Sequence, residues 1–137
     1  MTNTMNMANA YKTQQIMTSS PEQLTLMLYN GAIKFVDESI IALDGKDYTK
    51  SNESNLRAQD IIHEFMITLD MKQEISKNWM SLYDYIVYRL VQGNIKKDKE
   101  QLQEARNMIK DLRDTWAEAM KKVRSANTAG MAHAVGR

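Results

Sequence analysis

Apolar residues recur at alternating steps of three and four positions through the last third of the chain. From residue 98 to residue 124 these positions are Leu102, Ala105, Ile109, Leu112, Trp116, Ala119 and Val123. Because an α-helix has about 3.6 residues per turn, this spacing gathers all of these side chains on one face. Asp98, followed three residues later by Gln101, is typical of a helix start. The pattern therefore predicts an amphipathic helix over about residues 98–124.

The first helix is predicted from the sequence TSSPEQL near the start of the chain. Ser20 can cap this helix, and Pro21 occupies the first helical position, where its missing N–H leaves no hydrogen bond unmade. Gln23 completes a capping box with Ser20. Asp44 and Gly45 supply a stop and a turn at the other end. We therefore expect a helix from residue 21 to about residue 43.

Two further helices are expected between these elements. Asp47 is placed to cap a helix over residues 48–69, whose inward stripe is Leu56, Gln59, Ile62, Met66 and Leu69. The next helix begins between residues 70 and 76 and ends near residue 94; its stripe is Ile75, Trp79, Leu82, Tyr83, Ile86, Leu90 and Gly93. Short links force such helices to lie as antiparallel neighbours. The sequence predicts an all-α fold, an antiparallel up-down four-helix bundle.

Both ends of the chain differ from the helices in composition. Residues 1–18 are rich in Asn, Thr and Met, and the tail SANTAGMAHAVGR is small, polar and without periodicity. Ends of this kind have little apolar surface to bury. We expect residues 19–124 to form one bundle, residues 1–18 to be a mobile N-terminal cap segment and residues 125–137 to be a disordered tail.

The first helix carries more apolar surface than one face of a bundle requires. Beside a core stripe it has a second apolar series at the same spacing, namely Leu26, Tyr29, Ile33, Val36, Ile40 and Leu43. A helix that is apolar nearly all round is buried on both sides or presents a binding face. Either the N-terminal segment, with Tyr11 and Ile16, folds back as a short segment or helix over this groove, or that cover is exchangeable. A partner helix would then take its place.

Composition and charge exclude several classes of function. The chain has no cysteine, which removes a thiolate nucleophile, a sulfur-based zinc site and an iron–sulfur cluster. A balance of 18 basic against 17 acidic residues argues against a nucleic-acid surface. No stretch approaches the roughly 18 apolar residues of a membrane span, and the N-terminus lacks the apolar core of a signal peptide. We expect a cytosolic protein with no cofactor, nucleic-acid partner or membrane insertion.

Residues with catalytic chemistry are sparse. Asp60 and His63 have the spacing of a carboxylate–histidine metal pair, but the second pair that bundle metal sites require is missing, because the other histidine, His133, lies in the tail. No catalytic triad and no glycine-rich phosphate loop is present. A non-enzymatic protein is therefore expected. The alternative is a bundle metal or phosphotransfer protein that uses Asp60 and His63.

Several stretches match a known family in order and spacing. They are Ala10-Tyr11, SSPEQLTLMLYNGAIKF from residue 19, AQDII and TLD between residues 58 and 70, LYDYIVYRLVQGNIKKD from residue 82, and Trp116. On these stretches, over about residues 8–120, the chain resembles the flagellar export chaperones of the FliS type. The sequence MKQEI at residues 71–75 departs from the Gly-Gly-Glu-Ile turn of many members.

The resemblance implies a function and a set of binding residues. Family members bind the C-terminal region of flagellin in the cytosol, prevent its premature polymerisation and deliver it to the flagellar type III export apparatus, with the export gate and regulators as further partners. The N-terminal segment covers the groove until the client displaces it. A groove without client is also open to a second copy, which would give a homodimer. The expected partner-binding residues are Tyr11, Ile16, Leu26, Tyr29, Ile33, Val36, Leu82, Tyr83, Asp84, Tyr85, Arg89 and Asn94.

Overall fold

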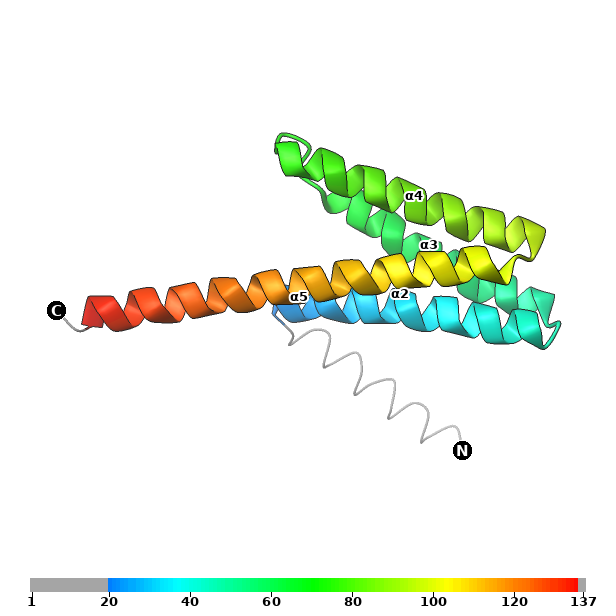
Figure 1. Ribbon diagram of the computed structural model, residues 1–137, viewed down its shortest axis with the longest axis horizontal. Helices are drawn as coiled ribbons and strands as arrows, with labels where there is room; N and C mark the ends of the chain where they lie inside the picture. Colours follow the sequence, from blue (N-terminus) through cyan, green and yellow to red (C-terminus); the bar gives the residue numbers. More distant parts are fainter. Residues whose placement is uncertain (1–19, 136–137) are drawn as a thin grey trace, which may run out of the picture.

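Four α-helices make up the described part of the chain. The computed structural model describes residues 20–135, and the side chains of residues 20–127. The helices are α2 (Pro21–Asp44), α3 (Tyr48–Thr68), α4 (Glu74–Lys96) and α5 (Lys99–Val135). They run up and down in alternation (Figure 1), and α2 and α4 each pack on both α3 and α5. The all-α antiparallel four-helix bundle is confirmed, whereas the N-terminal cap with Tyr11 and Ile16 lies outside the described residues.

The helix starts follow the capping residues of the sequence. The backbone N–H of Gln23 donates to Ser20 Oγ at 3.2 Å, and the backbone N–H of Ser20 donates to Gln23 Oε1 at 3.1 Å, which completes the predicted capping box. Asp47 accepts the backbone N–H of Lys50 at 3.2 Å. In contrast, Gln73 precedes α4 without a side-chain hydrogen bond to the helix. The two capped starts are those for which the sequence predicts a capping residue. The uncapped start is that of α4, which the sequence placed only between residues 70 and 76.

The turn between α2 and α3 places its strained backbone at a lysine. Lys46 has a φ of 61°, in the left-handed region that favours glycine, whereas the neighbouring Gly45 has an ordinary φ of −84°. A side chain in this region clashes with its own backbone. Glycine would relieve the strain at position 46, but in this chain the glycine of the turn is at position 45.

The Lys46→Gly variant is expected to be more stable than the natural chain. Relief of the left-handed strain, offset by the added freedom of the unfolded chain, gives a gain of about 0.5 to 1 kcal/mol. Urea unfolding followed by circular dichroism measures the change. Gly45→Ala is the matched control, because an added Cβ there meets its nearest atom at an ordinary 3.6 Å and should do no harm. A loss of stability in Lys46→Gly would contradict this account.

Polar side chains at the α2–α3–α4 contacts are buried in pairs. Ser51 Oγ donates to the carbonyl of Ser39 and Ser39 Oγ donates to the carbonyl of Ser51, both at 2.8 Å, across α2 and α3. Asn55 Nδ2 donates to the carbonyl of Leu90 at 3.1 Å, and Gln59 Nε2 donates to Asn55 Oδ1 at 2.7 Å. Because these groups have partners, their burial carries little cost. They fix α3 against both of its neighbours.

Three apolar residues that were predicted to face the core are exposed. Leu56 is 46% exposed, Ile75 59% and Leu82 39%. On α3, the inward position beside Leu56 is taken by the hydrogen-bonded Asn55. On α4, successive residues differ by about 100° around the helix axis, so burial of Tyr83 turns Leu82 toward the solvent. The predicted stripes were therefore right in period and wrong at these positions.

Helix α5 runs further than the sequence predicted. The expected end near residue 124 and the expected disordered tail over residues 125–137 are wrong for residues 125–135, which continue α5 to Val135. This stretch contains four alanines and no proline, and alanine has the highest helix propensity. Figure 1 shows the end of α5 projecting beyond the other three helices.

Candidate functional site

A cavity lies at one end of the bundle. At that end the pair of helices α3 and α4 diverges from the pair α2 and α5 (Figure 1). The cavity has a volume of about 430 Å³, within the roughly 300 to 1,000 Å³ that is usual for binding pockets. All four helices contribute to its wall. The lining residues are Thr25, Leu28, Tyr29, Glu64, Phe65, Thr68, Leu69, Ile75, Ser76, Trp79, Tyr83 and Trp116.

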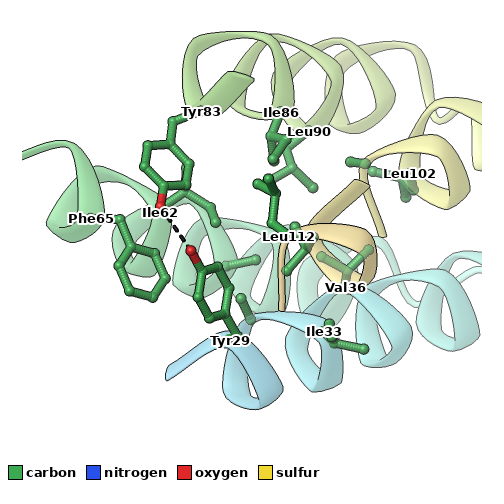
Figure 2. Close-up of a cluster of buried hydrophobic side chains, with 14 of the residues drawn as sticks. Tyr29, Ile33, Val36, Ile62, Phe65, Tyr83, Ile86, Leu90, Leu102 and Leu112 are labelled. Carbon is green, nitrogen blue, oxygen red and sulfur yellow. Dashed lines mark hydrogen bonds between the residues drawn. The ribbon is translucent and has the colours of Figure 1, made fainter. Parts of the chain in front are cut away.

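Aromatic rings form the inner wall of this cavity. Phe65 stacks on Tyr29 at a centroid distance of 4.5 Å and on Tyr83 at 5.7 Å. Trp79 lies against Tyr83 at 6.1 Å. Figure 2 shows Tyr29 of α2 and Tyr83 of α4 reaching toward each other beside Phe65, and their hydroxyl oxygens are 2.8 Å apart. This cluster presents a rigid apolar surface with one polar pair.

The apolar lining continues from the cavity along α5. Trp116 borders the cavity and also a smaller pocket of about 70 Å³ between α2 and α5, which Leu26 and Met120 line as well. Val123, further along the same face of α5, is 45% exposed. Since α4 begins only at residue 74, opposite the middle of α5, α2 is the neighbour of this strip of α5 among the described helices. The cavity and the strip, which share Trp116, together form an apolar track, bordered at the smaller pocket by the ion pair of Glu22 and Arg124.

Burial suppresses ionisation of the tyrosine pair. The pKa of Tyr29 is raised well above the ordinary 10.0 by burial and then by the hydrogen bond with Tyr83. Burial also raises the pKa of Tyr83. Both hydroxyls are therefore neutral at physiological pH and act as hydrogen-bonding groups.

Stability is expected to fall above about pH 10 because of this pair. Unfolded tyrosine loses its proton near pH 10, while the folded side chains hold theirs to higher pH, so the contribution is full below that pH and is lost as the pH rises. The slope is up to about 1.4 kcal/mol per pH unit for each tyrosine. Urea unfolding at a series of alkaline pH values measures it, and the Tyr29→Phe, Tyr83→Phe double variant should show a shallower fall. Equal slopes for the two proteins would exclude the tyrosine pair as the cause.

The predicted groove residues of the first helix fall in three different places. Ile33 and Val36 lie in the core, at 9% and 0% exposure, so they do not line an open groove. Tyr29 is also buried but reaches the cavity. Leu26 is half-buried in the smaller pocket on the α5 side. Most of the second apolar series is buried because α2 packs on both α3 and α5.

The motif residues of α4 are also divided. Tyr83 lines the cavity, whereas Leu82 and Asp84 are exposed. Asn94 Nδ2 donates to Asn52 Oδ1 on α3 at 2.8 Å. This hydrogen bond lies at the end of the bundle opposite to the cavity. Whether these residues bind a partner stays a prediction.

Tyr85 and Arg89 connect α4 to α5. The hydroxyl of Tyr85 donates to Glu104 Oε1 at 2.6 Å, and Arg89 Nε donates to that hydroxyl at 2.8 Å. Arg89 also pairs with Glu104 at 3.1 Å and donates to Gln101 Oε1 at 3.3 Å. The hydrogen bond that Arg89 donates to Tyr85 and the charge of Glu104 raise the pKa of Arg89. Arg89, an expected partner-binding residue, therefore ties α4 to α5 through Glu104 and Gln101.

The sequence reasoning missed several members of the site. Phe65 is the centre of the aromatic cluster, and Thr25, Glu64 and Thr68 complete the wall. A signal for Phe65 was available, because Ala58, Ile62 and Phe65 follow steps of four and three residues. The polar lining residues carry no comparable pattern.

The metal alternative receives no support from the described residues. Asp60 and His63 are both exposed on α3. Among residues 20–127, no group of three or more side chains of His, Asp or Glu is arranged to hold a metal ion. Within the same part of the chain, no helix is both long and apolar enough to cross a membrane.

The fold and the sequence both match flagellar chaperones. A solved structure described as a flagellar chaperone from bacteria superposes with a TM-score of 0.68, at 19% identity, covering 84% of this chain and 98% of that one. The family model described as flagellar protein FliS matches residues 4–123. The flagellar secretion chaperone FliS of Bacillus subtilis is 40% identical over 119 residues, 87% of this chain and 90% of that protein. That of Salmonella typhimurium is 29% identical over 110 residues, 78% and 82% of the two chains.

This chain belongs to the FliS family of flagellar proteins. It is a chaperone of flagellar secretion, as the resemblance implied, and this class of protein acts on a protein client without enzymatic chemistry. The expectation of a non-enzymatic protein is thereby confirmed by the relatives.

Proposed function

We propose that the chain binds the C-terminal region of flagellin in the cytosol, shields its apolar surface against premature polymerisation, and delivers it to the flagellar type III export apparatus. The observation that carries this proposal is the apolar track formed by the 430 Å³ cavity and the adjoining strip of α5. An amphipathic segment recognised by a helical protein commonly lies in such a groove. The family of secretion chaperones supplies the client class.

The chemistry of the track suits a client that folds as it binds. The cavity is lined mainly by aromatic and aliphatic side chains, with Glu64 as its charged member among the described residues. The smaller pocket adds Glu22 and Arg124, which pair with each other. Burial of apolar surface supplies the free energy that orders a disordered segment, and no nucleotide is needed. Trp79 of α4 and Trp116 of α5 both line the cavity and have the size of typical binding anchors.

The N-terminal segment is proposed as the exchangeable cover of this track. Ser20 precedes α2 directly, and Thr25, one helical turn further on, already lines the cavity. Residues 1–18 precede this helix in the chain, and Tyr11 and Ile16 are the proposed apolar side chains of the cover. The client would displace this cover. The export gate, regulators and a second copy of the chain are further proposed partners.

The test is titration calorimetry with a synthetic peptide of the C-terminal segment of flagellin from the same organism. The full chain is expected to bind with a negative heat-capacity change, and a variant lacking residues 1–17 is expected to bind more tightly. Trp116→Ala should weaken binding about tenfold or more, because the indole borders both parts of the track.

Tyr88→Ala is the matched control for the tryptophan variant. Tyr88 is 55% exposed on α4 and borders neither part of the track, so its removal should leave the affinity unchanged. Absence of peptide binding by both the full and the truncated chain would refute flagellin as the client. Dimerisation of the chain in place of peptide binding, measured by analytical ultracentrifugation, would assign the track to a second copy.

A further inference from the structure

The paired hydroxyls of Tyr29 and Tyr83 contain one more proton than their mutual hydrogen bond uses. Each phenol carries one O–H and can both donate and accept. With the oxygens 2.8 Å apart, one hydroxyl donates to the other. The accepting hydroxyl keeps its own proton, and no other hydrogen bond of either hydroxyl is found among the described residues. The pair therefore holds one donor for which no described residue supplies an acceptor.

This donor is buried in the wall of the cavity. Tyr29 is 2% exposed and Tyr83 is 4% exposed, and both side chains line the cavity. Buried donors in proteins almost always have a partner, because an unpaired donor has lost its water. Phenylalanine at both positions would fill the same space and would keep the stacking on Phe65, so packing alone does not account for two hydroxyls (Figure 2).

We propose that the unpartnered hydroxyl of this pair donates a hydrogen bond to a neutral oxygen of the bound client, a backbone carbonyl or a side-chain amide. The proposal rests on the proposed function, since it concerns the client of the same cavity. It adds a polar requirement: the client segment presents an acceptor oxygen next to the apolar side chains that fill the cavity. The last turn of a helix offers such oxygens, because its final carbonyls have no partner within the helix.

The client oxygen that accepts this hydrogen bond is neutral because the cavity already contains the negative charge of Glu64. Glu64 is the charged residue among the described lining residues, and its carboxylate repels a second carboxylate that enters the same space. A cationic client group has no acceptor capacity to offer the hydroxyl. A carbonyl or amide oxygen satisfies both conditions.

A purely structural role of the pair makes a different prediction. If the hydroxyls only tie α2 to α4, each single phenylalanine variant loses stability and none loses affinity for the client. If the pair supplies one donor, a single variant still retains a hydroxyl that can donate to the client, since the two oxygens are only 2.8 Å apart. The double variant then loses the donor altogether.

The experiment is titration calorimetry of the full chain with the flagellin C-terminal peptide, comparing the natural chain with Tyr29→Phe, Tyr83→Phe and the double variant. At least one single variant is expected to bind within about threefold of the natural chain, whereas the double variant binds about tenfold more weakly, because the client oxygen is left unpaired. Tyr88→Phe, which removes an exposed hydroxyl from α4, is the control and should bind normally. Thermal unfolding by circular dichroism establishes that each variant is folded.

The outcomes separate this inference from the function on which it rests. A double variant that is folded and binds as tightly as the natural chain overturns the inference and leaves the flagellin proposal intact. Equal loss of affinity in both single variants and in the double variant overturns the single-donor arrangement. A natural chain that gives no binding heat refutes the flagellin proposal itself, and the inference with it.

Discussion

The Phe65→Ala variant is expected to lose about 3 to 5 kcal/mol of unfolding free energy, the range measured for deletion of a buried aromatic ring. Phe65 is buried, and its ring stacks on both Tyr29 and Tyr83. Removal of the ring leaves a void beside the existing cavity and ends two aromatic contacts. Natural domains have an unfolding free energy of only about 5 to 15 kcal/mol. This single substitution would therefore remove a large part of the stability of the protein. Urea unfolding followed by circular dichroism measures the loss.

A smaller substitution at the same position keeps the prediction testable if the alanine variant does not fold. Phe65→Leu retains most of the apolar volume and should cost less than half as much. Ile67→Ala is the matched control on α3, because Ile67 is 76% exposed and its loss should change the stability little. A cost below about 1 kcal/mol for Phe65→Ala would mean that the aromatic cluster is not part of the stable core.

The Gly93→Ala variant is expected to lose about 1 to 3 kcal/mol, although alanine normally stabilises a helix interior. A Cβ at this position would lie 2.6 Å from Leu102 Cδ2 and 2.9 Å from Leu102 Cγ, distances that require movement. The carbonyl oxygen of Asp98 would also lie only 3.2 Å from the added Cβ. Leu102 is fully buried, so it has little room to retreat. Thermal unfolding of the purified variant tests the prediction.

Two further variants show whether the clash is the cause. In a Leu102→Ala background, which is itself less stable, the added cost of Gly93→Ala should nearly disappear, because the opposing atoms are gone. Gly31→Ala is the matched control: it also lies inside a helix, but its Cβ would meet Ile61 Cδ1 at an ordinary 3.6 Å. That variant should gain about 0.5 to 1 kcal/mol. Equal effects at the two glycines would refute the packing explanation.

The helices could be predicted because their signals are local. The capping box of Ser20 and Gln23 and the cap of Asp47 each act within one turn, and all appear as expected. The end of α5 could not be predicted from apolar periodicity, because residues 125–135 have none; their helix follows from alanine propensity instead. Lys46 shows a similar limit, since a glycine in the sequence marks a turn but not which residue takes the left-handed conformation.

The site was less predictable because it depends on how helices diverge. Ile33 and Val36 have the pattern of a binding face, but two neighbouring helices cover that face, which no single-helix pattern reveals. The cavity exists because α3 and α4 separate from α2 and α5 at one end (Figure 1). Tyr29 and Tyr83, which the sequence did single out, reach it from opposite helices.

The order of helix contacts around the bundle has a kinetic consequence. Among the described helices, three of the four extensive contacts join helices that follow one another in the chain, and the contact of α2 with α5 joins helices far apart in sequence. Proteins rich in contacts between near neighbours in sequence fold in microseconds to milliseconds. Closure of α2 on α5, along the ion pairs Asp44–Lys99, Asp37–Arg106 and Glu22–Arg124, carries the largest loop-closure entropy. We expect this closure to be the late step of folding.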